Sequence, residues 1–422
     1  MPLPHPASKG LPATALHAPA PQAPPHDWNL LRGDLPLPLA VLHEEALAHN
    51  LRWMQAYARR KGVWLAPHGK TTMSPELFTR QLAAGAWGLT FATAYQASVG
   101  VEAGARRIII ANQVVADADF RLLDALLRAR NDLRLWFLVD SHAQLALVEE
   151  WAEREGQGRV FDVLLELGVA GQRTGCRTHE QAMALAQALR ASPHVRLGGV
   201  ECYEGGLARC DSAHDSAAVS DLVRRAQALV READAHDLWE DSAVMLSAGG
   251  SAVFDLVLPL LQMQGLRRPV QGVLRSGCYI THDHGHYRRL LQQVEQREGL
   301  QDSLQPALEV WTHVQSVPEP GLALLTCGRR DISYDIEMPM PLRHLPRGAH
   351  NAVEAPASWT IRALNDQHAY LHFDPAAQDA PPAVGDRVVL GLSHPCTTFD
   401  KWRWMPVVNA AGDVVDAITT RF

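Results

Sequence analysis

The chain has 422 residues, of which 47% are hydrophobic, and its net charge is −7 at pH 7. This length fits one large domain with a smaller one, and the apolar content is sufficient for a sizeable core. The charged residues are scattered along the chain rather than gathered in basic blocks, which argues against nucleic acid as the main partner.

The sequence also lacks the marks of a membrane or a secreted protein. No apolar run is long enough to cross a bilayer, and the N-terminus does not show the basic, apolar and small-residue order of a signal peptide. Six cysteines without a framework spacing indicate reduced thiols, and these features together predict a cytoplasmic protein. The cysteines are Cys176, Cys202, Cys210, Cys278, Cys327 and Cys396.

The first 62 residues predict a tail, a strand and a helix. Residues 1–27 are rich in proline and alanine, which is typical of a flexible tail. Residues 35–42 are strand-like but contain two prolines, so we expect an edge strand that pairs into a later sheet. Residues 44–62 place apolar side chains on one face of a helix.

From residue 63 an alternation of apolar strands and amphipathic helices predicts a parallel sheet. Eight such units favour a (β/α)₈ barrel over residues 45–286. The rival is an open doubly wound sheet, which usually carries a glycine-rich turn after its first strand, whereas this chain has His68-Gly69-Lys70 there. The expected strands are 63–67, 88–93, 107–112, 133–140, 160–167, 196–203, 243–248 and 270–276, and the clearest helices are 118–130, 142–156, 179–191 and 213–236.

After about residue 286 the pattern changes to short strands separated by turns. Residues 28–44 together with 287–422 are therefore expected to form a second, β-rich domain. The fold class is α/β, a barrel with a β-rich second domain. The expected strands of the second domain are 308–317, 321–327, 359–365, 368–373, 387–392 and 406–409.

A lysine stands where the first barrel strand ends. In barrel enzymes the chemistry lies at the end where the strands lead into the following helices, so Lys70 is placed at the mouth. A lysine amine in that position can form a Schiff base with an aldehyde cofactor. The alternative is an ordinary exposed lysine, but the end of an apolar strand is not a typical solvated position.

Small residues follow the last two barrel strands and suggest a phosphate site. Gly249, Gly250 and Ser251 end the seventh strand, and Gly277 and Tyr279 follow the eighth. Backbone N–H groups at such turns can cradle an anion, and a helix beginning at Ala252 would point its N-terminus at it. The alternative is a tight turn without a ligand. A phosphate site beside Lys70 would indicate pyridoxal phosphate.

The late segment with His394 and Cys396 is the second notable feature. On an extended segment two residues apart face the same side, and an imidazole with a thiolate favours zinc. We expect this segment to fold back over the barrel mouth. A separate histidine-rich stretch, residues 282–286, is the alternative metal site and would make the chain a metal-dependent barrel hydrolase. The polar stretch 329–335 either lines the site or forms a surface loop.

The motifs occur in the order found in a known family. Pro67-His68-Gly69-Lys70-Thr71 resembles the P-H-x-K-T signature of the D-serine dehydratase / D-threonine aldolase family, pyridoxal-phosphate enzymes of the alanine-racemase-like fold. The resemblance extends from about Leu39 to the C-terminus and includes the 172–175 segment, the glycine turn, Asp283 and the His-x-Cys pair. Glycine before the lysine and the segment after Thr71 depart from the usual pattern.

The resemblance implies roles for individual residues. Lys70 is expected to carry the Schiff base, with Arg173 near the phenolic oxygen of the cofactor and Tyr203 near its ring. The phosphate is expected at Gly249, Gly250, Ser251, Gly277 and Tyr279, and a zinc-like divalent metal at His394 and Cys396. A homodimer is also implied.

The resemblance further implies a lyase. A His-x-Cys pair is typical of the dehydratase type and His-x-Asp of the aldolase type, so we expect a D-β-hydroxy amino acid to lose water and yield a 2-oxo acid and ammonia. Retro-aldol cleavage to glycine and an aldehyde is one alternative. A non-catalytic protein that only binds pyridoxal phosphate is another, but such relatives lack a β-rich domain.

Overall fold

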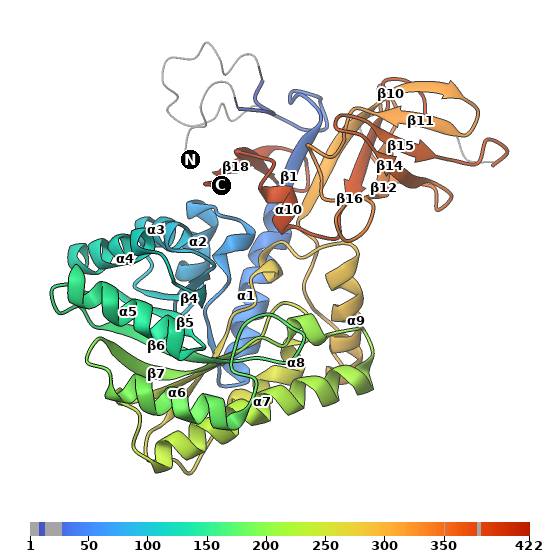
Figure 1. The fold of residues 1–422 in the computed structure, drawn as a ribbon. Coiled ribbons are helices and arrows are strands. Elements are labelled where there is room, and N and C mark those ends of the chain that lie inside the picture. The colour runs from blue at the N-terminus through green and yellow to red at the C-terminus, as the bar shows by residue number, and fades with distance from the viewer. Residues whose placement is uncertain (1–7, 13–27, 350, 378–380) are drawn as a thin grey trace.

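A computed structural model describes residues 8–12, 28–349, 351–377 and 381–422. Its strands form an eight-stranded sheet and a ten-stranded sheet. The first is surrounded by helices, and the second stands above its mouth (Figure 1). Most of the predicted tail lies outside the described residues. Within residues 8–12, Lys9 Nζ lies 2.8 Å from Asp331 Oδ1 and over the Trp402 ring.

The eight-stranded sheet is parallel and confirms the barrel. Its order is β2-β9-β8-β7-β6-β5-β4-β3, and a parallel bridge between His68 and Thr90 joins the two ends of this order. Each of the eight predicted strands is present. They are β2 Trp64–Leu65, β3 Leu89–Phe91, β4 Arg107–Gln113, β5 Arg134–Val139, β6 Phe161–Leu167, β7 Val195–Cys202, β8 Val244–Ala248 and β9 Val270–Leu274.

Several helices of the barrel begin at a polar N-cap. Ser74, Thr93, Ser141 and Thr178 each accept a hydrogen bond from a backbone N–H of the first turn, which satisfies a donor that the helix itself leaves free. The helices are α1 Glu44–Arg60, α2 Pro75–Ala83, α3 Ala94–Glu102, α4 Asp117–Ala129, α5 His142–Arg154, α6 His179–Ala191, α7 Ser212–Ala235, α8 Phe254–Val257 and α9 His286–Glu298. None of the helices in the described ranges is both long and apolar enough to cross a bilayer.

The ten-stranded sheet contains strands from both ends of the chain. β1 (Leu39–His43) pairs with β10 on one side and with β17 on the other, so it lies inside the sheet. The prediction of an edge strand is wrong because Pro36 and Pro38 precede the strand rather than lie in it. The other strands are β10 Leu308–Glu319, β11 Leu322–Leu325, β12 Met340–Leu345, β13 Val353–Glu354, β14 Thr360–Leu364, β15 Ala369–His372, β16 Arg387–Gly391, β17 Trp404–Val408 and β18 Val414–Thr419.

The β-rich sheet is fixed to the barrel near α2. Arg80 of α2 forms an ion pair of 2.6 Å with Asp416 of β18, and Thr419 of the same strand donates its hydroxyl to Glu76. The short helix α10 (Cys396–Phe399) lies where the second domain faces the barrel (Figure 1). This attachment brings residues from the end of the chain to the barrel mouth.

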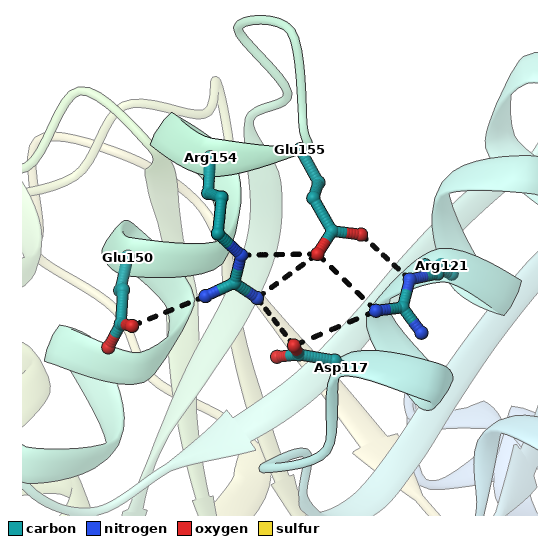
Figure 2. A network of polar contacts seen from close by, with 5 residues as sticks. All are labelled: Asp117, Arg121, Glu150, Arg154 and Glu155. Carbon is teal, nitrogen blue, oxygen red and sulfur yellow. Dashed lines mark hydrogen bonds and ion pairs between the residues drawn. The ribbon is translucent and has the colours of Figure 1, made fainter.

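The outer surface of the barrel carries a network of charges that joins α4 to α5. In Figure 2, Arg154 lies between the carboxylates of Asp117, Glu150 and Glu155. Arg121 forms ion pairs with Asp117 and Glu155. All of these side chains face water, where solvent and salt weaken such pairs. The network therefore orients the two helices but contributes little to the stability of the barrel.

Candidate active site

A pocket opens at the mouth of the barrel, where the strands end. Its empty volume is about 780 Å³, which includes open solvent at the entrance. Three basic side chains line it, from three different strand ends: Lys70, Arg173 and Arg275. The pocket therefore suits an anionic ligand.

Lys70 is the lysine whose amine is available for chemistry. It is exposed at the pocket and forms no ion pair with any residue that the structure describes. The chain has four lysines, and each of the other three has a carboxylate within ion-pair distance. These pairs are Lys9 with Asp331, Lys61 with Glu298 and Lys401 with Asp400.

Gly69 permits the turn that positions Lys70, because no residue larger than glycine fits at position 69. Residues Gly69–Thr71 form one 3₁₀ turn after β2. A Cβ at Gly69 would lie 2.3 Å from Phe91 Cε1 and 2.9 Å from Phe78 Cε1. These rings are buried and stacked edge to face, so they cannot withdraw into open space. The glycine that departs from the family signature is therefore required by the packing below the turn.

We expect Gly69→Ala to destabilise the protein by about 1–3 kcal/mol, the usual cost of an extra methyl group in a filled core. The turn should also shift, so that cofactor loading and turnover fall together. Urea unfolding and the visible absorption of the loaded protein measure the two effects. Unchanged stability and loading would contradict this role of Gly69.

Arg173 and Tyr203 lie against each other at the pocket wall. The guanidinium carbon of Arg173 is 4.1 Å from the centroid of the Tyr203 ring, a cation–π contact. Gly250 lies below the same ring, since a Cβ there would meet Tyr203 Cε2 at 3.1 Å. The structure thus brings Lys70, Arg173 and Tyr203 to one pocket, as the sequence predicts.

The floor of the pocket is a buried ion pair between Arg275 and Glu201. Both side chains are at most 3% exposed, and Arg275 also donates to Ser247 Oγ at 2.9 Å. Burial raises the pKa of Glu201 to about 8, while Arg275 acts in the opposite direction. Desolvation lowers the pKa of His68, and the nearby charges of Lys70 and Arg275 lower it further, so its imidazole is neutral.

Three polar atoms of this floor lack a partner among the described residues. They are His68 Nδ1, Glu201 Oε2 and Arg275 Nε, each with almost no exposed surface. Buried polar atoms are nearly always hydrogen-bonded in folded proteins, so three unpaired ones beside a free lysine fit a polar ring ligand. On this observation the residues at the mouth fit pyridoxal phosphate at its ring and aldehyde.

The predicted phosphate turn is occupied by the protein itself. The N–H groups of Gly249 and Gly250 both donate to the buried carboxylate of Glu204, each at 2.9 Å. The pair can thus bind two anionic oxygens, but a phosphate there would have to displace Glu204. The expected helix from Ala252 is wrong, because α8 begins at Phe254 and has four residues, too short to supply a helix N-terminus.

The other predicted phosphate residues lie below or beside the pocket. Ser251 Oγ accepts the N–H of Cys278 at 3.1 Å, and Gly277 lies against the His68 carbonyl. Tyr279 is buried, and its hydroxyl accepts a hydrogen bond of 3.3 Å from Gln81 of α2. Neither Gly277 nor Tyr279 is among the residues that line the pocket.

The His394 and Cys396 segment folds back to the barrel mouth, as expected. Cys396 Sγ donates to Thr71 Oγ1 at 3.4 Å, directly after Lys70. The expectation of an extended segment is wrong, because Pro395 has helical angles and Cys396 begins α10. His394 Nδ1 instead bonds to Asp335 Oδ2 at 2.5 Å, so the 329–335 stretch does reach the site.

The described residues contain no group of three or more His, Cys, Asp and Glu side chains arranged to hold a metal ion. The chemistry of the donors at 394 and 396 nevertheless fits one. Asp335 accepts the Nδ1 proton of His394, which fixes the tautomer and leaves Nε2 as a ligand, the usual second contact of a metal-binding histidine. The thiol of Cys396 supplies a soft second donor.

The alternative metal site at residues 282–286 has a structural role. Asp283 accepts the N–H groups of Gly285, Tyr287 and Arg288, and so caps the start of α9. Burial lowers the pKa values of His282 and His284, to about 3 and about 4. Among the described residues, the 282–286 stretch therefore contains no metal-binding cluster of the kind that the hydrolase alternative requires.

The sequence analysis did not select Arg275, Glu201, Glu204 or Asp335 as site residues. Arg275 and Glu201 carry a signal, since both stand at barrel strand ends. Asp335 belongs to the polar 329–335 stretch, for which lining the site was one of two interpretations, but its partner His394 lies 59 residues away. Glu204 carries no signal of its own, because its partner Gly249 lies 45 residues away in the chain.

Two families match this chain. Residues 42–262, more than half of the chain, match the alanine racemase N-terminal domain, and residues 307–408 match a putative serine dehydratase domain. The chain belongs to the alanine racemase family. The predicted family and fold are thereby confirmed.

Similar proteins of this family are named as lyases. D-threonine aldolase of Arthrobacter sp. is 29% identical over 372 residues, 88% of this chain and 89% of the relative. D-threo-3-hydroxyaspartate dehydratase of Delftia sp. (strain HT23) is 31% identical over 193 residues, 45% of this chain and 49% of the relative. The prediction that the chain is an enzyme of the lyase class is confirmed at this level.

Solved structures agree with the fold. D-threonine aldolase from Filomicrobium marinum superposes with a TM-score of 0.75 at 24% identity, covering 92% of this chain and 95% of the other. Two variants of D-threo-3-hydroxyaspartate dehydratase superpose at a TM-score of 0.70 and 22% identity, covering 93% and 94% of this chain and 96% and 99% of theirs. One replaces a histidine by alanine. The other replaces a cysteine two positions later and is in the metal-free form.

Proposed function

We propose that this protein is a pyridoxal-phosphate- and metal-dependent lyase that removes water from a D-β-hydroxy amino acid. The products are a 2-oxo acid and ammonia. The observation that carries the proposal is the placement of Lys70, a lysine without an ion pair at the pocket, directly beside the segment that contains His394 and Cys396.

The relatives support the substrate class and the metal. Each of the curated relatives is named for a D-amino acid with a hydroxyl group on its β-carbon. The histidine and cysteine replaced in the dehydratase variants have the same spacing as His394 and Cys396. This agreement supports a divalent metal at the pair, and a cysteine in the second position supports the dehydratase type.

Each group at the mouth has a defined task in this proposal. Pyridoxal phosphate, when bound, accepts the electron pair that the α-carbon releases. Arg173, Tyr203 and Arg275 would hold its ring and oxygen atoms. Lys70, once the substrate amine has replaced it, takes the α-proton as a general base. His394 and Cys396 would hold a Lewis-acidic metal for the β-hydroxyl.

The balance of the reaction explains the need for a metal. The α-carbon loses a proton, the β-carbon loses its hydroxyl group, and a double bond forms between them. Hydroxide is a poor leaving group, so protonation or a Lewis acid is required at its oxygen. The released enamine takes up water to give the 2-oxo acid and ammonia, so D-serine yields pyruvate.

Aldol cleavage is the second candidate. It is favoured by the D-threonine aldolase relative, which aligns over 88% of this chain. In that reaction the base takes the proton of the β-hydroxyl, and the bond between the α- and β-carbons breaks instead of the bond to oxygen.

Product analysis with purified, cofactor-loaded protein decides between the two. D-serine, D-threonine and D-threo-3-hydroxyaspartate are each offered with their L-enantiomers as controls. We expect 2-oxo acid and ammonia in equal amounts from at least one D-substrate. Glycine with an aldehyde would establish the aldolase reaction, and turnover confined to L-substrates would contradict both.

The homodimer implied by the resemblance and the cytoplasmic location predicted from the sequence are also part of this proposal. Sedimentation of the loaded protein tests the first, with a species of twice the 46.3 kDa chain expected. A monomer that retains full turnover would contradict it.

A further inference from the structure

Glu204 is a buried carboxylate that has no task in the reaction derived so far. It follows Tyr203 directly in the chain, and its side chain is completely buried. Its Oε2 accepts the N–H of Gly249 and its Oε1 accepts the N–H of Gly250, each at 2.9 Å. Hydrogen bonds to an ionised acceptor are stronger than those between neutral groups, so the carboxylate and the turn hold each other firmly.

The Gly249–Gly250 turn depends on such outside contacts for its shape. Gly249 has a φ of +96°, a backbone conformation that glycine adopts readily and other residues rarely adopt. Glycine also has the greatest backbone freedom, so two glycines in succession do not fix a turn by themselves. The carbonyl of Gly249 accepts the N–H of Arg275 at 3.2 Å. Glu204 on the N–H side and Arg275 on the carbonyl side therefore hold the turn from both sides.

Free N–H groups follow this turn. The N–H groups of Ser251, Ala252 and Val253 donate no hydrogen bond to any residue that the structure describes. Ala252 and Val253 are nevertheless buried, at 5% and 1% exposure, and buried N–H groups are nearly always paired in folded proteins. Successive backbone N–H groups in a turn can bind an anion. The free donors thus begin one residue beyond the pair that Glu204 occupies.

We propose that Glu204 is a positioning residue for the phosphate of the cofactor. It holds the Gly249–Gly250 turn in shape, and the phosphate binds at the free N–H groups that follow the turn. This inference rests on the pyridoxal phosphate of the proposed function. It removes the competition between Glu204 and the phosphate, because the carboxylate stays where it is. Moving Glu204 instead would strip a buried charge of both its hydrogen bonds, which is costly away from water.

The effect of Glu204 should be confined to the phosphate end of the ligand. Lys70 lies on a different turn, Gly69–Thr71, which packs on the rings of Phe78 and Phe91. Neither of these rings is in contact with the Gly249–Gly250 turn through any hydrogen bond to Glu204. The Schiff base at Lys70 should therefore form with or without the carboxylate of Glu204.

Binding of two aldehydes to the full chain, freed of cofactor, tests this role. Pyridoxal phosphate and pyridoxal differ only in the phosphate, and the visible absorption band gives a dissociation constant for each. In Glu204→Ala we expect the constant of pyridoxal phosphate to rise by about 10-fold or more, because the two charge-assisted hydrogen bonds that hold the turn are lost. The constant of pyridoxal should not change.

Two further variants sharpen the comparison. Glu204→Gln keeps the size of the side chain and one acceptor oxygen, so its constant for pyridoxal phosphate should lie between those of the unaltered protein and Glu204→Ala. Glu150→Ala removes an exposed carboxylate on α5 and should change neither constant. An unfolded Glu204→Ala would fail to bind pyridoxal as well, and Glu204→Gln then decides by the same comparison.

Tighter binding of pyridoxal phosphate by Glu204→Ala would show that Glu204 competes with the phosphate, and it would overturn the inference. An unchanged constant, or equal weakening of both aldehydes in Glu204→Gln, would also overturn it. If the unaltered protein binds both aldehydes equally well at Lys70, the phosphate role falls but the proposed lyase remains. If it forms a Schiff base with neither, the proposed function falls together with the inference.

Discussion

Replacing Lys70 by alanine is expected to lower turnover of the D-β-hydroxy substrate by about 10³-fold or more, because both the covalent anchor of the cofactor and the proton acceptor are lost. The visible absorption of the bound cofactor should disappear in the same variant. Turnover assays and an absorption spectrum of the purified protein measure the two effects. Fluorescence of the buried tryptophans shows whether the variant is folded.

Lys61→Ala is the matched control for this variant. Lys61 lies at the end of α1, where its Nζ is 2.6 Å from Glu298, far from the pocket lining. Its removal should leave the absorption band and the turnover unchanged. A band that survives in Lys70→Ala and vanishes in a variant of another lysine would contradict the assignment.

Replacing His394 by alanine is expected to lower turnover by about 10³-fold while the cofactor band remains, since a Lewis acid on a leaving oxygen contributes several kcal/mol. Chelation of the metal from the unaltered protein should have the same effect, and added zinc should restore the activity. Asp335→Asn should give a smaller loss, about 10- to 100-fold in metal affinity, because Asp335 acts by orienting His394.

His142→Ala is the control for the histidine variant, because His142 is exposed at the start of α5 and does not line the pocket. Its turnover and zinc content should match those of the unaltered protein. Full activity of His394→Ala, or activity that survives complete removal of divalent metal, would show that the leaving group departs without a metal.

The sequence predicts the barrel well because its strands are short apolar runs, five of which lead to a helix with a polar side-chain cap. The misassigned edge strand shows the limit of local reasoning: Pro36 and Pro38 mark the chain before β1, but its neighbours β10 and β17 come from the far end of the sequence. Helix α9 escaped prediction because only Leu290, Leu291 and Val294 of its residues face the core.

The candidate site likewise contains residues that the sequence indicates and contacts that it does not. Lys70 is visible in the sequence because it follows a strand that ends at the mouth, whereas Arg173 and Tyr203 are expected there from the family resemblance. The contact of Glu204 with the Gly249–Gly250 turn is not, since a glycine turn has the same sequence whether it binds a phosphate or a carboxylate of its own chain. The approach of Cys396 to Thr71 likewise depends on how the second domain is seated on the barrel.

Borohydride reduction of the purified holoenzyme, followed by peptide mass spectrometry, tests the central claim most directly. The chain contains four lysines, so the position of the reduced cofactor can be read without ambiguity. We predict that the adduct is found on the peptide containing Lys70. An adduct on Lys9, Lys61 or Lys401, or no adduct on a protein that turns over substrate, would contradict the account.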